Sequence, residues 1–178
     1  MGQLGATAVA KAAESLARRL DDAEQAVRGA CRGSLRKLDV GTALRSSEPA
    51  LRGWAAEVVA GRGSDASVYG EVMAKLLSDE SKDVRYWAAS ALSGMGAAAA
   101  EFAAEVEKAV KDPNPDVWPH ILRIISLHVT QALDGACTAM VSHFADDDAH
   151  RRRCAIRALG SARDSALPFM GEVAKCLE

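Results

Sequence analysis

The chain repeats itself with a period of 33 residues. The segment 51–56, LRGWAA, returns at 84–89 as VRYWAA and, in a more divergent form, at 117–122 as VWPHIL. A fixed period of this length indicates stacked supersecondary units, which together form a solenoid. Because each unit buries its apolar face against its neighbours, solenoids present extended surfaces that mostly bind other macromolecules.

Each unit carries two helical faces. Apolar or small residues recur at +3, +4, +7 and +8 from five anchor positions, namely Val27, Leu51, Val84, Val117 and, by spacing, Arg151. This spacing marks one face of an α-helix. Further apolar residues stand 7 and 11 positions before each anchor, such as Leu77 and Met73 before Val84, and they mark a second helix. The pattern predicts an all-α solenoid.

The predicted helices fall into one domain that covers residues 1–178. An opening helix at about 5–20 precedes five helix pairs. First helices are expected at about 23–35, 49–60, 82–95, 116–129 and 148–160, and second helices at about 38–45, 65–78, 97–111, 132–145 and 164–177. The second helix at 38–45 should be short or irregular, because Val27 and Leu51 are only 24 residues apart.

Polar turns and glycines separate the helices. Five residues before the anchors stand Asp22, Ser46, Asp79, Asp112 and Asp146. Aspartate favours turns, and its charge suits a helix N-terminus, so we expect Asp83 and Asp116 to cap the helices that follow. Glycines at 61, 63, 94, 96 and 160 predict C-caps and tight turns into the second helices.

The segment 79–92, DESKDVRYWAASAL, resembles the HEAT repeat, and 146–160 is a looser match. The short period is similar to that of the HEAT-like repeats in phycobilin lyase subunits. The resemblance implies a right-handed superhelix whose second helices line the concave face. It also implies a ladder in which the turn aspartate of one repeat bonds the arginine of a neighbour, here through Asp79, Arg85, Asp112, Asp146 and Arg152. Trp118 replaces an arginine, so we expect the ladder to break there and Trp118 to be partly exposed.

The sequence offers no recognisable catalytic or metal-binding motif. No two of the four histidines have the i, i+4 spacing of a helical metal site, and the four cysteines form no C-x-x-C pair. Cys31, Cys154, Trp54, Trp87 and His120 fall on core faces, where a packing role is expected. We therefore predict no catalytic residue, no cofactor and no metal. No apolar run is long enough to span a membrane, and the expected location is intracellular, in the cytoplasm or an organelle interior, without secretion.

These features predict a non-enzymatic interaction scaffold or a subunit of a larger assembly. Over the second helices, taken as 64–77, 97–111, 131–145 and 164–178, nine acidic residues stand against four lysines. An acidic concave face, together with a net charge of -2, disfavours nucleic acid and favours a basic or mixed protein segment. The predicted partner-binding residues are Glu71, Glu101, Glu105, Lys108, Glu172 and Lys175.

Two alternatives stay open at this point. One is a HEAT-like enzyme subunit similar to the bilin lyases, and the other is a nucleic-acid-binding protein similar to the HEAT-like DNA glycosylases. The last predicted helix also ends without a polar cap. Its apolar residues Phe169, Met170, Val173 and Leu177 would leave an edge partly uncovered, so we expect a longer parent chain or another subunit to cover that edge.

Overall fold

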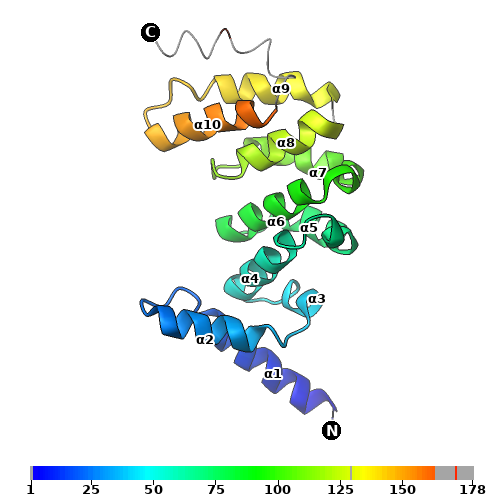
Figure 1. Cartoon of the computed structure of the whole chain (residues 1–178), viewed down its shortest axis with the longest axis vertical. Helices are drawn as coiled ribbons and strands as arrows, with labels where there is room; N and C mark the ends of the chain where they lie inside the picture. The colour runs from blue at the N-terminus through cyan, green and yellow to red at the C-terminus, as the bar shows by residue number, and fades with distance from the viewer. Residues whose placement is uncertain (1, 129, 163–170, 172–178) are drawn as a thin grey trace. The chain divides into compact units, whose positions relative to one another are not determined.

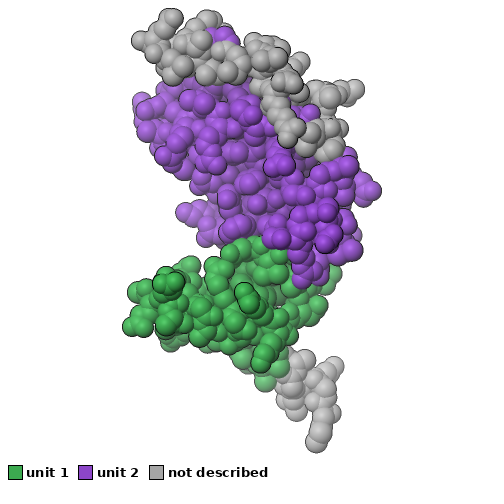
Figure 2. Space-filling view, in the orientation of Figure 1, with its two compact units in different colours: residues 1–59 green, residues 60–178 purple. Residues whose placement is uncertain are grey.

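The computed structural model describes residues 2–128, 130–162 and 171, and these residues form helices and turns without any strand (Figure 1). The all-α prediction is therefore confirmed. The chain forms two compact units, residues 1–59 and residues 60–178 (Figure 2). Among the described residues, no helix has the length and apolar character needed to cross a bilayer.

Unit 1 contains four helices, which are α1 (Gly2–Ala17), α2 (Gln25–Leu35), α3 (Val40–Ala43) and α4 (Pro49–Ala60), the last of which ends at the boundary of the unit. The observed α2 and α4 agree with the predicted first helices. As the 24-residue spacing predicts, the second helix of this pair is a single turn. Asp39 caps it, since its carboxylate accepts a hydrogen bond from the backbone N–H of Thr42 at 2.7 Å. Leu35, Leu44 and Trp54 are buried in this unit.

The described part of unit 2 contains three first helices, which are α6 (Lys82–Gly94), α8 (Trp118–His128) and α10 (Ala149–Ser161). They pack in that order, with α8 against both α6 and α10. Their core faces bury apolar side chains such as Leu92, Ile121, Ile125 and Leu159. This packing follows from the +4, +7 and +8 positions, which place those residues on one side of each helix. The predicted helix at 164–177 lies outside the described residues.

The second helices of unit 2 differ from the continuous helices that were predicted. The first consists of η1 (Gly63–Tyr69) and α5 (Gly70–Leu76), and the next of η2 (Gly96–Phe102), α7 (Ala103–Lys108) and η3 (Ala109–Lys111), where η marks a 3₁₀ helix. α9 (Thr130–Val141) is a single α-helix. The interruptions fall at Tyr69 and Phe102, whose ψ angles of 2° and 24° depart from the α-helical value.

Two glycines turn the chain from a first helix into the next second helix. Gly63 and Gly96 have φ angles of 58° and 61°, in the left-handed region that costs glycine least. These two turns agree with the prediction. The expectation of a C-cap at Gly160 is wrong, because that residue lies inside α10, which continues to Ser161.

Candidate functional site

The polar residue five positions before each anchor shapes the turn that leads into a first helix. Its side-chain oxygen accepts a hydrogen bond from the backbone N–H two residues further on, as in Asx and Ser/Thr turns. The five bonds are Glu24 to Asp22 (3.0 Å), Glu48 to Ser46 (3.1 Å), Ser81 to Asp79 (2.9 Å), Asn114 to Asp112 (2.7 Å) and Asp148 to Asp146 (3.0 Å). The turn is therefore the most regular feature of the repeat.

The predicted caps Asp83 and Asp116 do not act as N-caps. The N-cap of α6 is Ser81, while Asp83 lies in the first helical turn. Asp116 precedes α8, and its carboxylate lies 3.3 Å from Nε2 of His150 on α10. The cause is the turn geometry. The residue five positions before each anchor forms the turn into the helix, so the aspartate directly before the anchor makes other contacts.

A side chain one position after each anchor ties this turn to its helix. In four repeats an arginine Nη1 donates to the carbonyl oxygen of the turn residue six positions earlier; the pairs are Arg28 to Asp22 (2.6 Å), Arg52 to Ser46 (2.9 Å), Arg85 to Asp79 (2.9 Å) and Arg152 to Asp146 (2.7 Å). Trp118 makes the equivalent bond, from its indole Nε1 to the carbonyl of Asp112 at 2.9 Å. Trp118 is 1% exposed, so the expectation of partial exposure is wrong. The indole replaces the arginine because a single N–H donor suffices for this bond.

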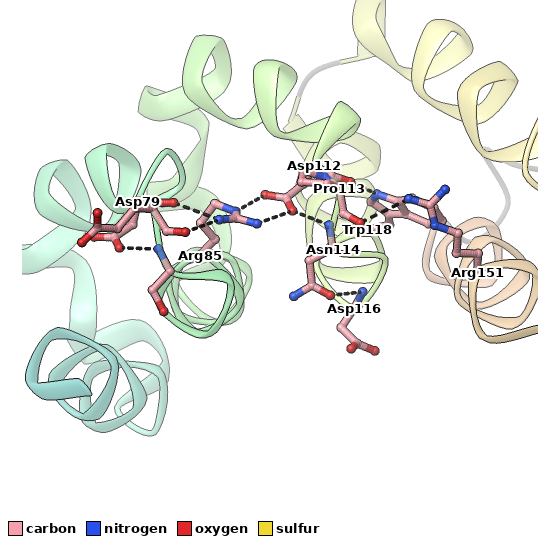
Figure 3. Close-up of polar contacts among 10 residues, drawn as sticks. Asp79, Arg85, Asp112, Pro113, Asn114, Asp116, Trp118 and Arg151 are labelled. Carbon is pink, nitrogen blue, oxygen red and sulfur yellow. Dashed lines mark hydrogen bonds and ion pairs between the residues drawn. The ribbon is translucent and has the colours of Figure 1, made fainter. Parts of the chain in front are cut away.

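Arg85 also links two neighbouring repeats (Figure 3). Its Nε lies 2.7 Å from Oδ2 of Asp112, and its Nη2 lies 3.2 Å from Oδ1. The two side chains are 13% and 4% exposed. Since Oδ1 of Asp112 also accepts the N–H of Asn114, this carboxylate accepts three hydrogen bonds, and the pair is both buried and bidentate.

The next repeat is connected differently. Trp118 has no guanidinium to offer Asp146, whose Oδ2 lies 3.3 Å from Nη1 of Arg151 instead. Nη2 of Arg151 also reaches the carbonyl of Pro113 at 3.5 Å (Figure 3). The backbone N–H of Asp148 and, next, the Arg151 and His143 side chains hold the pKa of Asp146 below its usual value, against the opposing effect of burial. Through the carbonyl of Pro113, Arg151 therefore makes an inter-repeat contact, which Trp118 cannot make because it has no guanidinium.

A hollow of about 440 Å³ opens between the first helices of unit 2. Its lining consists of Lys82, Asp83, Tyr86, Trp87, Asn114, Asp116, His120 and Arg157. The rings of Trp87 and His120 meet the Tyr86 ring edge to face, with centroids 5.0 and 5.3 Å apart. Trp87 and His120 are half-buried, which corrects their assignment to the closed core. Both rings line the hollow, which leaves part of each side chain uncovered.

The half-buried imidazole of His120 predicts a pH dependence. Burial and, next, the guanidinium groups of Arg157 and Arg123 lower the pKa of His120, against a smaller opposing effect of Asp116. The unfolded chain therefore binds this proton at a higher pH than the folded chain, and stability falls as the pH drops below about 6.5. We expect His120→Gln to lose less unfolding free energy than the wild type between about pH 7.5 and pH 5.5, measured by urea denaturation. An identical loss in both proteins would contradict this.

The predicted partner-binding residues lie on consecutive second-helix segments. Glu71 (on α5), Glu101 (on η2) and Lys108 (on α7) are exposed, and Glu105 (on α7) is half-buried. α5 contacts both η2 and α7. The contact is close at Gly70, where an added Cβ would lie 2.5 Å from the Phe102 ring. Glu71 accepts a hydrogen bond from Lys75 at 2.7 Å. Glu172 and Lys175 lie outside the described residues.

A cluster of three side chains was missed by the sequence analysis. Asp116, His150 and Cys154 bring one carboxylate oxygen, one ring nitrogen and one sulfur within 4.8 Å of one another. The spacing of the histidines alone does not indicate this cluster, because the i, i+4 pair on α10 consists of a histidine and a cysteine. Asp116 comes from 38 residues before Cys154, and only the packing of α8 on α10 brings it close.

The geometry defines an α-helical repeat solenoid, and several solved structures share this fold. The crystal structure of an engineered protein from the Northeast Structural Genomics Consortium has a TM-score of 0.56 at 17% identity, over 92% of this chain and 84% of that chain. A designed armadillo repeat protein in complex with the peptide (KR)4 has a TM-score of 0.55 at 18% identity, over 86% and 82%. A second engineered protein from the same consortium has a TM-score of 0.52 at 18% identity, over 85% of this chain and 48% of that chain.

Part of the chain matches a known repeat family in sequence. Residues 38–118 match the family model of HEAT repeats, and this segment contains three of the turn residues described above (Ser46, Asp79 and Asp112), two of the arginines (Arg52 and Arg85) and both glycine turns. This match supports assignment of residues 38–118 to the HEAT-repeat family. No curated protein matches the chain. Repeat folds of this kind are typical of protein-interaction scaffolds.

Proposed function

We propose that the chain is a non-enzymatic scaffold that binds a basic, extended segment of a partner protein. The binding site would be the second-helix surface of unit 2, defined as the exposed side of η1, α5, η2, α7 and η3. The observation that carries this proposal is the set of carboxylates at Glu71, Glu101 and Glu105. These residues lie on segments of two successive repeats, and the segments contact each other.

The charge on this surface favours a cationic partner. The five segments hold five acidic residues, Asp65, Glu71, Glu101, Glu105 and Glu107, and three lysines, Lys75, Lys108 and Lys111. Among the described residues, no ion pair neutralises Glu101 or Glu105. Complementary charge of this kind raises the rate of encounter and sets specificity more than it adds affinity. We therefore propose that these acidic residues determine which partner binds.

The spacing favours an extended partner. Lys75 and Lys108 occupy equivalent positions 33 residues apart, and so do Val68 and Glu101. Val68 is 82% exposed, which places an apolar contact in the same row as a carboxylate. A surface that repeats in one direction suits a segment whose side chains also repeat in one direction.

The comparison with solved structures supports the same class of ligand. A designed armadillo repeat protein of similar fold was solved in complex with (KR)4, a peptide of alternating lysine and arginine. At 18% identity the similarity shows the fold alone. It therefore suggests which kind of ligand to test, and it does not indicate which residues contact that ligand.

The alternatives have less support in the described residues. An acidic surface repels phosphates, which disfavours nucleic acid there. A thiol enzyme would need a relay through two different ring nitrogens, whereas Asp116 and Cys154 both approach Nε2 of His150, at 3.3 and 3.7 Å. Cys154 is also buried, and burial followed by the charge of Asp116 raises its thiol pKa, which disfavours the nucleophilic thiolate.

Charge reversal tests the proposal. We expect the double variant Glu101→Lys and Glu105→Lys to weaken binding of a labelled (KR)4 peptide by about tenfold at low salt, because two attractive contacts become repulsive. Fluorescence anisotropy would measure the affinity, and added salt should reduce the difference. The melting temperature should change little, because Glu101 is exposed, Glu105 is only half-buried, and neither is in an ion pair among the described residues.

A matched control separates a local effect from net charge. Asp21→Lys with Asp147→Lys changes the total charge by the same amount at exposed turn positions outside this surface. If both double variants lose the same affinity, the peptide responds to net charge alone and the proposed surface is wrong. It is equally wrong if substitutions at Tyr86 and His120 abolish binding while the Glu101 and Glu105 variant retains it.

A further inference from the structure

We propose that Asp116, His150 and Cys154 form a binding site for a divalent metal ion of the Zn²⁺ class, with a fourth coordination position left to water or to a partner's side chain. Each residue supplies a different ligand atom, and all three types are established zinc ligands. This site is separate from the second-helix surface, since it lies between the start of α8 and the first turns of α10.

The distances between the ligand atoms fit tetrahedral coordination. Oδ1 of Asp116 lies 3.3 Å from Nε2 of His150 and 3.6 Å from Sγ of Cys154, and Sγ lies 3.7 Å from Nε2. A tetrahedral Zn²⁺ with ordinary bond lengths holds oxygen, nitrogen and sulfur ligands about 3.3–3.6 Å apart. The three atoms would therefore need to move by only about a tenth or two of an ångström to coordinate the ion.

The fold holds the three ligands in place before any ion binds. His150 and Cys154 are one helical turn apart on α10, so their side chains lie on the same face. Asp148 caps this helix by accepting the N–H of His150 at 2.8 Å, which fixes its first turn. Asp116 follows the turn at Asp112, and its backbone N–H donates to Oδ1 of Asn114 at 3.2 Å. An ion would thus meet ligands from two packed elements.

Burial and charge also suit a metal ion. Cys154 is fully buried, whereas Asp116 and His150 are half-buried, so an ion has access from the side of the hollow that Asp116 lines. A carboxylate and a thiolate together neutralise a divalent cation, and the soft sulfur favours Zn²⁺ over Mg²⁺ or Ca²⁺. Binding would displace the thiol proton of Cys154.

The histidine must change its hydrogen bonding when the ion binds. Nδ1 of His150 lies 2.7 Å from Nη2 of Arg153, so in the neutral ring Nδ1 accepts and Nε2 carries the proton. Coordination through Nε2 moves that proton to Nδ1, which then needs an acceptor in place of the guanidinium. Arg153 is exposed and is free to turn toward solvent. The net release is about one proton, from Cys154.

Cobalt substitution tests the site directly. The full chain, reduced and freed of metal by a chelator, is titrated with Co²⁺ and then with Zn²⁺. We expect one ion per chain, a thiolate-to-cobalt charge-transfer band with the intense visible bands of tetrahedral Co²⁺, and displacement by Zn²⁺ with release of about one proton. Zn²⁺ should also raise the melting temperature.

Three variants decide the assignment. Cys154→Ala should abolish the charge-transfer band. His150→Ala should weaken Co²⁺ binding by more than about 100-fold, because about 100-fold is the upper limit for loss of a residue that only hydrogen-bonds a metal ligand. Because His150 is half-buried, its variant keeps the test valid if Cys154→Ala fails to fold. Cys31→Ala, at another buried cysteine, should keep the band. A folded wild-type chain without the band in excess Co²⁺, or a band that survives in Cys154→Ala, would overturn the proposal and leave a hydrogen-bonded cluster only.

Discussion

Replacing Asp112 with alanine is expected to lower the free energy of unfolding by about 3–5 kcal/mol. The substitution leaves the Arg85 side chain, which is 13% exposed, without its partner carboxylate, and it leaves the N–H of Asn114 without the acceptor at 2.7 Å. An uncompensated buried charge costs far more than an exposed ion pair contributes. Urea unfolding followed by circular dichroism would measure the loss.

Asp146 provides the matched control, because it occupies the same turn position one repeat later. Its carboxylate and the side chain of its partner Arg151 are 21% and 37% exposed, so water replaces much of the lost interaction. Asp146→Ala should therefore cost only about 1 kcal/mol. Equal losses in the two variants would show that the turn bond, and not the buried ion pair, determines the cost.

Trp118→Ala is expected to destabilise the chain by about 3–5 kcal/mol, the range for a large aromatic side chain removed from a core. The smaller change Trp118→Phe should cost about 1–3 kcal/mol, because it leaves the carbonyl of Asp112 without the indole donor at 2.9 Å. The same urea titration would measure both losses.

Trp87→Ala is the control for the tryptophan variants. Trp87 is half-buried and lines the hollow, so its removal should cost clearly less than the removal of Trp118. If Trp118→Phe has no effect, the indole N–H does not replace the arginine. If Trp118→Ala costs no more than Trp87→Ala, position 118 is not part of the core.

Local patterns in the sequence predicted most of the fold. The first helix predicted at 49–60 is α4, Pro49–Ala60, because a repeated core face and a polar turn mark both ends of such a helix. The 24-residue spacing likewise predicted a reduced second helix, which is the single turn α3. The breaks at Tyr69 and Phe102 could not be predicted, because apolar spacing is similar whether a segment is α-helical throughout or begins as a 3₁₀ helix.

The contacts of individual side chains were harder to predict. Trp118 replaces an arginine, and the repeat pattern does not indicate that an indole N–H reaches the same carbonyl oxygen. Trp54 and Trp87 occupy equivalent positions, yet Trp54 is 5% exposed and Trp87 is half-buried, since the space beside each ring depends on the neighbouring helices. The cluster of Asp116, His150 and Cys154 depends on packing between α8 and α10, which periodicity does not report.

The most direct test of the central claim is the location of a bound basic peptide on the chain. Amide hydrogen exchange of the full chain, measured by mass spectrometry with and without saturating (KR)4, would give this location. We expect protection to increase in η1, α5, η2 and α7, and we expect the Glu101→Lys and Glu105→Lys double variant to lose this increase. Protection confined to the first turns of α6, α8 and α10, around the hollow, would contradict the claim.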